Sequence, residues 1–143
     1  MSALAALQQA IFTRLSNDGP LAALGFGVFD EPPSGGQASR YVAIGEATEV
    51  RGGIGTSESM SHDSRECTET LHVWTRGFST LVAKQGMGLV CEALESTPLA
   101  VAGWGMGTAR CEFATFMRDK QGDEMWRHGV LRFRVVVGKA LTA

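Results

Sequence analysis

The most regular pattern in the chain lies near its C-terminus, where apolar side chains alternate with others over residues 128–137. With a period of two, the residues that share the apolar face are Leu131, Phe133, Val135 and Val137. The opposite face carries His128, Arg132 and Arg134, together with Val136 at one end. The pattern predicts a long, half-buried strand whose second face is suited to a partner.

The remaining pattern predicts two amphipathic helices and four further strands. Apolar residues recur at helical spacing over residues 2–16 and again over 78–96. The strands that we expect before the last one cover residues 27–30, 40–46, 63–75 and 110–118. A hairpin turn at 119–123 connects the last of these to the final strand, at about 125–137. We therefore expect an α+β domain in which two helices pack on one face of a largely antiparallel sheet of about five strands.

Two local features add detail to this outline. In the 110–118 strand, alternation assigns Cys111, Phe113, Thr115 and Met117 to one side. In the second helix, Gly86 lowers helix propensity by roughly 1 kcal/mol against alanine, and we interpret it as a position of close approach.

Residues 48–62 are polar and rich in glycine. A loop of this length is unusual in a compact domain. We interpret the segment as a functional arm or as a hairpin extension that a partner orders.

Length and composition place the chain among ordinary globular proteins. Its 143 residues suit a single domain spanning 1–143, with 44% hydrophobic residues and a net charge of −2. The 13 lysines and arginines are scattered, so no basic patch for nucleic acid is expected. No stretch approaches the roughly 18 to 20 apolar residues that span a bilayer, so no membrane partner is expected. The three cysteines lack paired spacing and no signal peptide is apparent, which favours buried free thiols in a reducing compartment.

The chain offers little that resembles catalytic chemistry. His62, His72 and His128 share no metal-binding spacing, so we expect no metal and no cofactor. The sequence lacks a Gly-x-Ser-x-Gly elbow, although a Ser-His-Asp triad is recognised by geometry and stays open at this stage. The segment from Arg51 to Ser57 imitates a phosphate loop but has no lysine, and a flexible loop is the favoured interpretation. We expect no enzymatic activity.

The three tryptophans are large enough to anchor either a core or an interface. Trp126 shares its predicted face with His128, Arg132 and Arg134, and we interpret it as an interface residue. Trp74 and Trp104 are expected in the core. For the two arginines, interface and solvent stay equally open.

Three stretches in this order carry a resemblance to a known family: residues 41–46 (Tyr-Val-Ala-Ile-Gly-Glu), 71–74 (Leu-His-Val-Trp) and 123–134. Together they resemble the phage tail-completion family, which is also seen in prophages and gene transfer agents. The resemblance implies a tail terminator of the siphophage type, a structural subunit of a ring, usually hexameric. Such a ring caps the head-proximal end of the tail tube, ends tail polymerisation and joins the tail to the head connector.

The resemblance also implies partners and a location. The partners would be further copies of the chain, the tail tube protein and a connector or stopper protein, and DNA would pass through the lumen without sequence-specific binding. The chain would be assembled in the bacterial cytoplasm and reside in the tail of a phage-like particle. The residues that we expect at a subunit or tube interface are Arg51, Gly52, Gly53, Ile54, Gly55, Trp126, His128, Arg132 and Arg134. The alternative is a small α+β domain that binds or hydrolyses a small molecule.

Overall fold

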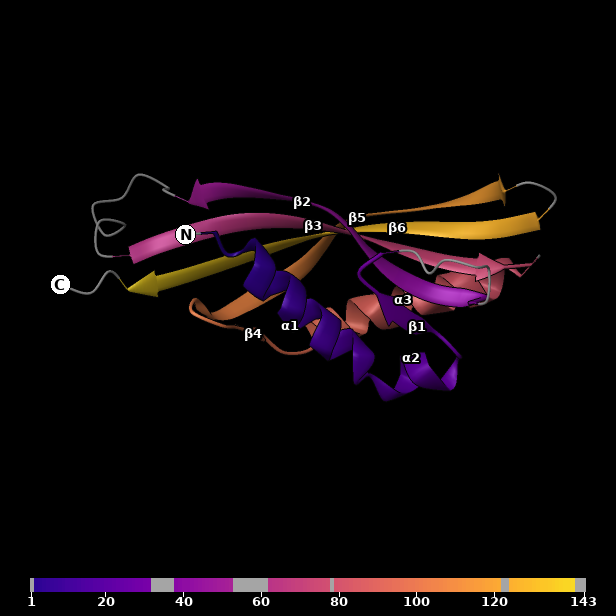
Figure 1. Cartoon of the computed structure of the whole chain (residues 1–143), viewed down its shortest axis with the longest axis horizontal. Helices are drawn as coiled ribbons and strands as arrows, with labels where there is room; N and C mark the ends of the chain where they lie inside the picture. Colours follow the sequence, from indigo (N-terminus) through magenta and orange to yellow (C-terminus); the bar gives the residue numbers. More distant parts are fainter. Residues whose placement is uncertain (1, 32–37, 53–61, 78, 122–123, 141–143) are drawn as a thin grey trace.

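The computed structural model describes residues 2–31, 38–52, 62–77, 79–121 and 124–140, which form three helices and a six-stranded sheet. The elements in chain order are α1 (Leu4–Ser16), α2 (Gly19–Ala23), β1 (Gly27–Phe29), β2 (Arg40–Gly52), β3 (His62–Arg76), α3 (Thr80–Glu95), β4 (Leu99–Val101), β5 (Gly105–Gln121) and β6 (Glu124–Ala140). The strand order is β1-β2-β3-β6-β5-β4, and only β1 and β2 pair in parallel. Figure 1 shows the four long strands running the length of the molecule, with the helices on one side. This confirms the predicted α+β class, although the sheet has six strands rather than about five.

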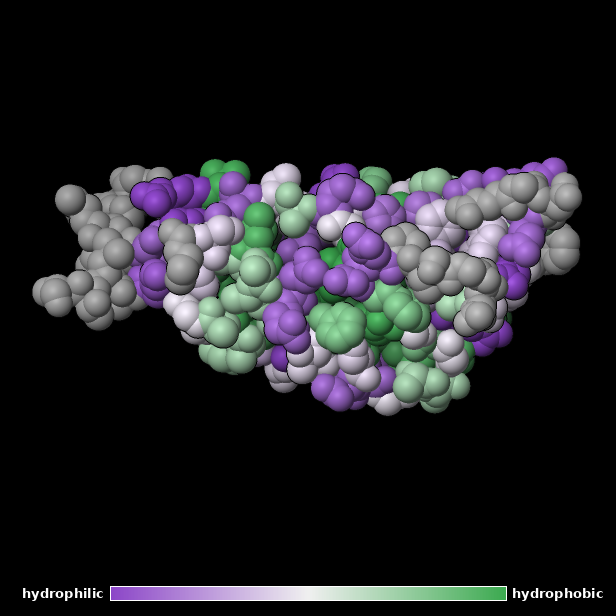
Figure 2. Space-filling model, viewed as in Figure 1, coloured by the Kyte–Doolittle hydropathy of each residue, from purple (hydrophilic) through white to green (hydrophobic). Residues whose placement is uncertain are grey.

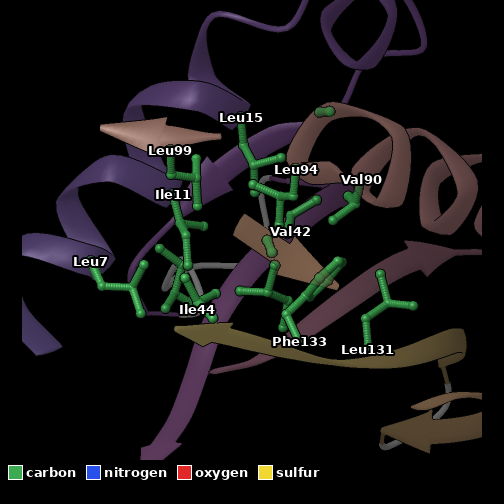
Figure 3. Close-up of a cluster of buried hydrophobic side chains, with 14 of the residues drawn as sticks. Leu7, Ile11, Leu15, Val42, Ile44, Val90, Leu94, Leu99, Leu131 and Phe133 are labelled. Carbon is green, nitrogen blue, oxygen red and sulfur yellow. The ribbon is translucent and has the colours of Figure 1, made fainter. Parts of the chain in front are cut away.

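The centre of the sheet is the antiparallel pair of β3 and β6. Leu131 lies opposite Leu71, and Val135 lies opposite Cys67. The predicted apolar face of the last strand is confirmed, because Leu131, Phe133, Val135 and Val137 are all buried. Figure 3 shows Leu131 and Phe133 pointing toward side chains from α1, α3, β2 and β4. We call this helix-covered side of the sheet the core face.

Both predicted amphipathic helices cover the core face. Helix α1 buries Leu7, Ile11 and Leu15, and α3 buries six residues that include Val90 and Leu94. A Cβ atom at Gly86 of α3 would lie only 2.5 Å from the Phe26 ring, which confirms the predicted close approach. The helices are therefore held in place by packing on the sheet more than by helix propensity.

The described part of the segment 48–62 forms a hairpin extension, one of the two predicted alternatives, and it pairs within the chain without a partner. Strand β2 continues to Gly52, and its residues from Thr48 onward pair with β3 between Ser64 and Thr68. A bulge between Ile44 and Ala47 precedes this extension. The polar composition was misleading because β3 satisfies the backbone hydrogen bonds while the side chains can face water. Residues 53–61 lie outside the described part of the chain.

A difference from the prediction concerns the side-chain alternation in β5. Cys111 lies opposite Phe133, whereas Phe113 lies opposite Arg132, because a bulge separates the two. An extra residue in one strand reverses the faces beyond it. Phe113, Thr115 and Met117 therefore lie on the face opposite to that of Cys111, and the prediction of one shared side is wrong.

We predict that Leu131→Asp abolishes folding, because it places an unpaired carboxylate in the core at a cost of several kcal/mol against a total stability of about 5 to 15. The matched control is Val136→Asp, since Val136 is on the same strand and is half exposed. Circular dichroism during thermal unfolding should show a native transition for the control and none for Leu131→Asp. Equal melting temperatures would contradict the assigned register.

Candidate interaction surface

The side of the sheet that faces away from the helices, which we call the outer face, carries most of the exposed large apolar side chains among the described residues. The described residues include six large hydrophobic side chains that are clearly exposed, and strand alternation places five of them here. These five, between 41% and 62% exposed, are Val50, Met106, Phe113, Met117 and Val136. Figure 2 shows apolar groups among hydrophilic ones along the sheet side, at the top of the view. A surface of this kind is typical of a protein–protein contact.

A network of charges lies in the middle of the outer face. The Arg134 guanidinium is 2.8 Å from Glu66 and 3.4 Å from Glu112, so it bridges β3, β6 and β5. The Arg132 guanidinium lies over the Phe113 ring, 5.0 Å from its centroid. Both arginines are exposed, as the predicted alternation requires. The cluster is electrically balanced, and it separates Val50 and Val136 at one end from Met117 at the other.

Trp126 lies on the predicted face but is almost completely covered by its own chain. Its exposed fraction is 6%, and its ring meets Tyr41 and Trp74 edge to face at 6.0 Å. The Arg76 guanidinium lies over the same ring. Trp126 therefore packs within its own chain, because β1 and the start of β2 bring Phe29 and Tyr41 across to form a small second core. Its assignment to an interface stays a prediction.

The other two tryptophans differ from each other. Trp104 is buried on the core face, as expected, with the Arg65 guanidinium and the Lys139 ammonium over its ring. Trp74, also expected in the core, is only half buried at the margin of the second core on the outer face. The Trp74 ring stacks on the ring of His128.

Three rings stack beside this second core. The His128 ring lies parallel to Trp74, with centroids 3.7 Å apart, and His128 Nε2 is 2.8 Å from Nδ1 of His72. Glycine at position 45 makes room for the stack, because a Cβ atom there would lie 2.7 Å from the His72 ring. The two histidines come from neighbouring strands and are far apart in sequence, so only knowledge of the β3–β6 register could have brought them together.

The stack has its own electrostatics. Burial and the neighbouring His72 lower the pKa of His128, while Asp119 and Glu46 oppose the shift. Folding therefore favours neutral His128, and this contribution to stability is lost as the pH falls below the ordinary value of 6.5. The lowered pKa of His128 therefore favours its uncharged ring within the stack.

The remaining predicted interface residues lie near the far end of the β2–β3 hairpin. Arg51 is exposed and lies opposite Arg65 in the β2–β3 register, and Gly52 lies opposite Ser64. Gly53, Ile54 and Gly55 lie outside the described residues. The hairpin end and the His128 stack are thus at opposite ends of the long strands, and the structure does not bring all the predicted residues into one site.

The described residues include no cluster of three or more histidine, cysteine or acidic side chains that could hold a metal ion. None of the helices in the described segments is long and apolar enough to cross a membrane.

Glu69 is a buried carboxyl group that the sequence pattern left unexplained. It is 1% exposed on the core face of β3, and its Oε2 has no hydrogen-bond partner among the described residues. Burial raises its pKa from 4.5 to about 7. Glu69 is two residues from both Cys67 and Leu71, so it shares their face of β3. Its burial follows once that face is known to be the core face.

Comparison with known proteins decides the family. A family model described as Tail completion protein gp17 matches residues 9–138. The chain belongs to this tail completion family. A solved structure titled "Virion of native gene transfer agent (GTA) particle" contains a chain that is similar to it, with 26% sequence identity and a TM-score of 0.81. The similarity covers 96% of this chain and 98% of that one. A comparison with curated proteins found no match.

Family membership gives the outer face a context. The exposed apolar groups around the Arg134 network are a surface suited to contact with other proteins. The resemblance that the three sequence stretches indicated is confirmed.

We predict that Glu69 makes this tail completion protein less stable as the pH rises. The raised folded-state pKa means that the stabilising contribution is complete below pH 4.5 and is lost as the pH rises through about 7. The full change is about 3 kcal/mol. Glu69→Gln removes the titration, so urea unfolding should show a variant whose stability relative to the parent increases from pH 5 toward pH 8.

The matched control is Glu92→Gln, because Glu92 is exposed on α3. Its stability should follow that of the parent at every pH. A Glu69→Gln profile parallel to that of the parent would contradict the raised pKa.

Proposed function

We propose that this protein caps the head-proximal end of a tail tube, ends tail polymerisation and joins the tail to the head connector, as a single-domain subunit of a ring of six copies. The observation that carries the proposal is the family match over residues 9–138. The likeness to a chain of a gene transfer agent virion over nearly its whole length supports a place in a phage-like particle.

The physical problem of tail length explains why such a protein is needed. A growing tube exposes the same unsatisfied interface after each added ring, so growth stops only when a protein binds that interface without recreating it. A ring whose two faces differ meets this requirement, with one face for the tail tube protein and the other for a connector or stopper protein.

A closed head-to-tail ring needs two different patches on every subunit, and the sheet has two candidates. Strand β1 pairs with the edge of β2 only at Tyr41–Ala43, and β4 pairs with the edge of β5 only at Gly105–Gly107. No other described strand pairs with the rest of these two edges. Because β2 and β5 are at opposite sides of the four long strands, their free edges suit contact between successive subunits.

The outer face supplies the remaining contacts. We assign Arg132 and Arg134 to an interface together with the exposed apolar groups around them. His128 contributes through its ring stack, and Trp126 supports that stack from within the chain. Arg51, Gly52, Gly53, Ile54 and Gly55 are proposed as a second contact at the hairpin end.

We place the protein in the tail of a phage-like particle that is assembled in the bacterial cytoplasm. DNA passes through the lumen of the ring without sequence-specific binding. The ion pairs of Arg134 with Glu66 and Glu112 support this view, because a phosphate-binding surface would leave its cations unpaired.

We predict that the double variant Phe113→Asp, Met117→Asp folds but fails to assemble. Both side chains are exposed on the outer face, so the substitutions cost little stability in the free subunit but bury two charges in an interface. Native mass spectrometry and pull-down on tail tubes should show a monomer that does not bind.

The control is Leu81→Asp, because Leu81 is also a large exposed apolar residue but lies on α3, on the helix side of the sheet. This variant should assemble like the parent. Normal rings and tube binding by the outer-face variant would contradict the assignment of the surface.

We further predict that deletion of the gene leaves filled heads without joined tails, and free tubes of irregular or excessive length. Electron microscopy of a lysate provides the measurement, with plasmid-borne expression of the parent chain as the control. Transfer-competent particles of normal tail length in the deletion strain would contradict the proposed function.

A further inference from the structure

Two of the three cysteines meet where α3 packs on β5. Cys91 is on α3 and Cys111 is on β5, and both are free thiols that are half buried against the same hydrophobic core. Neither the outer face nor family membership assigns them any role.

A hydrogen bond outside the two thiols fixes how the helix and strand face each other. Glu95 lies one helical turn beyond Cys91, and its Oε2 accepts the backbone N–H of Cys111 at 2.9 Å. Since residues four apart share one side of a helix, this bond holds Cys111 against the side of α3 that carries Cys91. The bulge after Cys111 keeps its side chain toward the helix while Phe113 turns to the outer face.

The two thiols interact directly. Burial and hydrogen bonding to the Cys111 thiol raise the pKa of Cys91 to about 12. The Cys111 thiol in turn donates to the Phe113 carbonyl across the bulge, at 3.6 Å. The pair is thus placed by the backbone at the bulge and by Glu95, with the Cys111 sulfur oriented by a hydrogen bond.

Both thiols of the pair are only partly buried, so a small reagent has access to them. Cys67 provides an internal contrast, because it is fully buried on the core face and burial and nearby carboxylates raise its pKa to about 11.

We propose that Cys91 and Cys111 form a reversible disulfide that locks α3 to the β5 bulge when the protein meets a low-molecular-weight disulfide. In the first step Cys111 attacks the reagent, one sulfur binds Cys111, and the other leaves as a thiol. In the second step Cys91 attacks the mixed disulfide at the Cys111 sulfur, and the second reagent thiol leaves. Two protein thiols are oxidised, and the reagent disulfide is reduced to two thiols that take up both protons.

The bond closes a loop from residue 91 to residue 111, which restricts the unfolded chain and fastens a helix of the core to the sheet. We expect the melting temperature to rise on the order of 5 to 10 °C. The chemistry depends only on the subunit, so it stands apart from the proposed function. In a particle that leaves a reducing cytoplasm, the bond would form after assembly.

The test treats the purified full chain with oxidised glutathione and follows it by intact mass and non-reducing peptide mapping. We expect the loss of two hydrogens, a peptide pair joined through Cys91 and Cys111, and recovery of both thiols with dithiothreitol. Cys91→Ala should stop at the mixed disulfide on Cys111, whereas Cys67→Ala should form the bond as the parent does.

Three results would overturn the proposal: a bond that involves Cys67, a parent that stops at the mixed disulfide, or thiols that stay reduced. Phenylarsine oxide, which binds two neighbouring thiols at once, gives a second readout that does not need folding of a variant. The parent should bind one equivalent and be protected from glutathione oxidation. Absence of binding by the parent would count against the pair.

Discussion

The strict alternation of β6 between two faces is the constraint on which the rest of the structure depends. Because Leu131, Phe133, Val135 and Val137 must all avoid water, the sheet needs a cover on that side, and α1 and α3 supply it. A shift of one residue in the β3–β6 register would move the arginines inward and these four side chains outward. Register, helix placement and the composition of the outer face are therefore consequences of one pattern.

The same constraint leaves the outer face without a cover. The chain reduces the cost of this exposure in two ways: it buries Tyr41 and Trp126 in a second small core, and it places the Arg134 ion pairs between the remaining apolar groups. The result is a surface that is compatible with a free subunit yet retains exposed apolar area for an interface. The core face contains a buried carboxyl group, Glu69, whose pKa burial raises to about 7. Its ionisation as the pH rises through this value destabilises the fold.

The sequence pattern was sufficient for features that depend on local periodicity. The two amphipathic helices, the apolar face of β6 and the close approach at Gly86 all follow from spacing. The extension of β2 to Gly52 and the bulge after Cys111 depend instead on hydrogen bonds to a neighbouring strand, which single-strand periodicity does not contain. The same limitation hid the stack of His72 on His128 and the packing of Trp126 against Tyr41, because both depend on which strands are neighbours. Family resemblance, by contrast, was readable from three short stretches in order.

The central claim is that this tail completion protein stands between tail tube and head with its outer face in contact with other subunits. Electron cryomicroscopy of intact particles tests it most directly. The account predicts a ring of this chain at the head-proximal end of the tube, with Phe113, Met117 and Val136 covered by neighbouring proteins. A chain located elsewhere in the particle, or one whose outer face stays open to solvent, would contradict it.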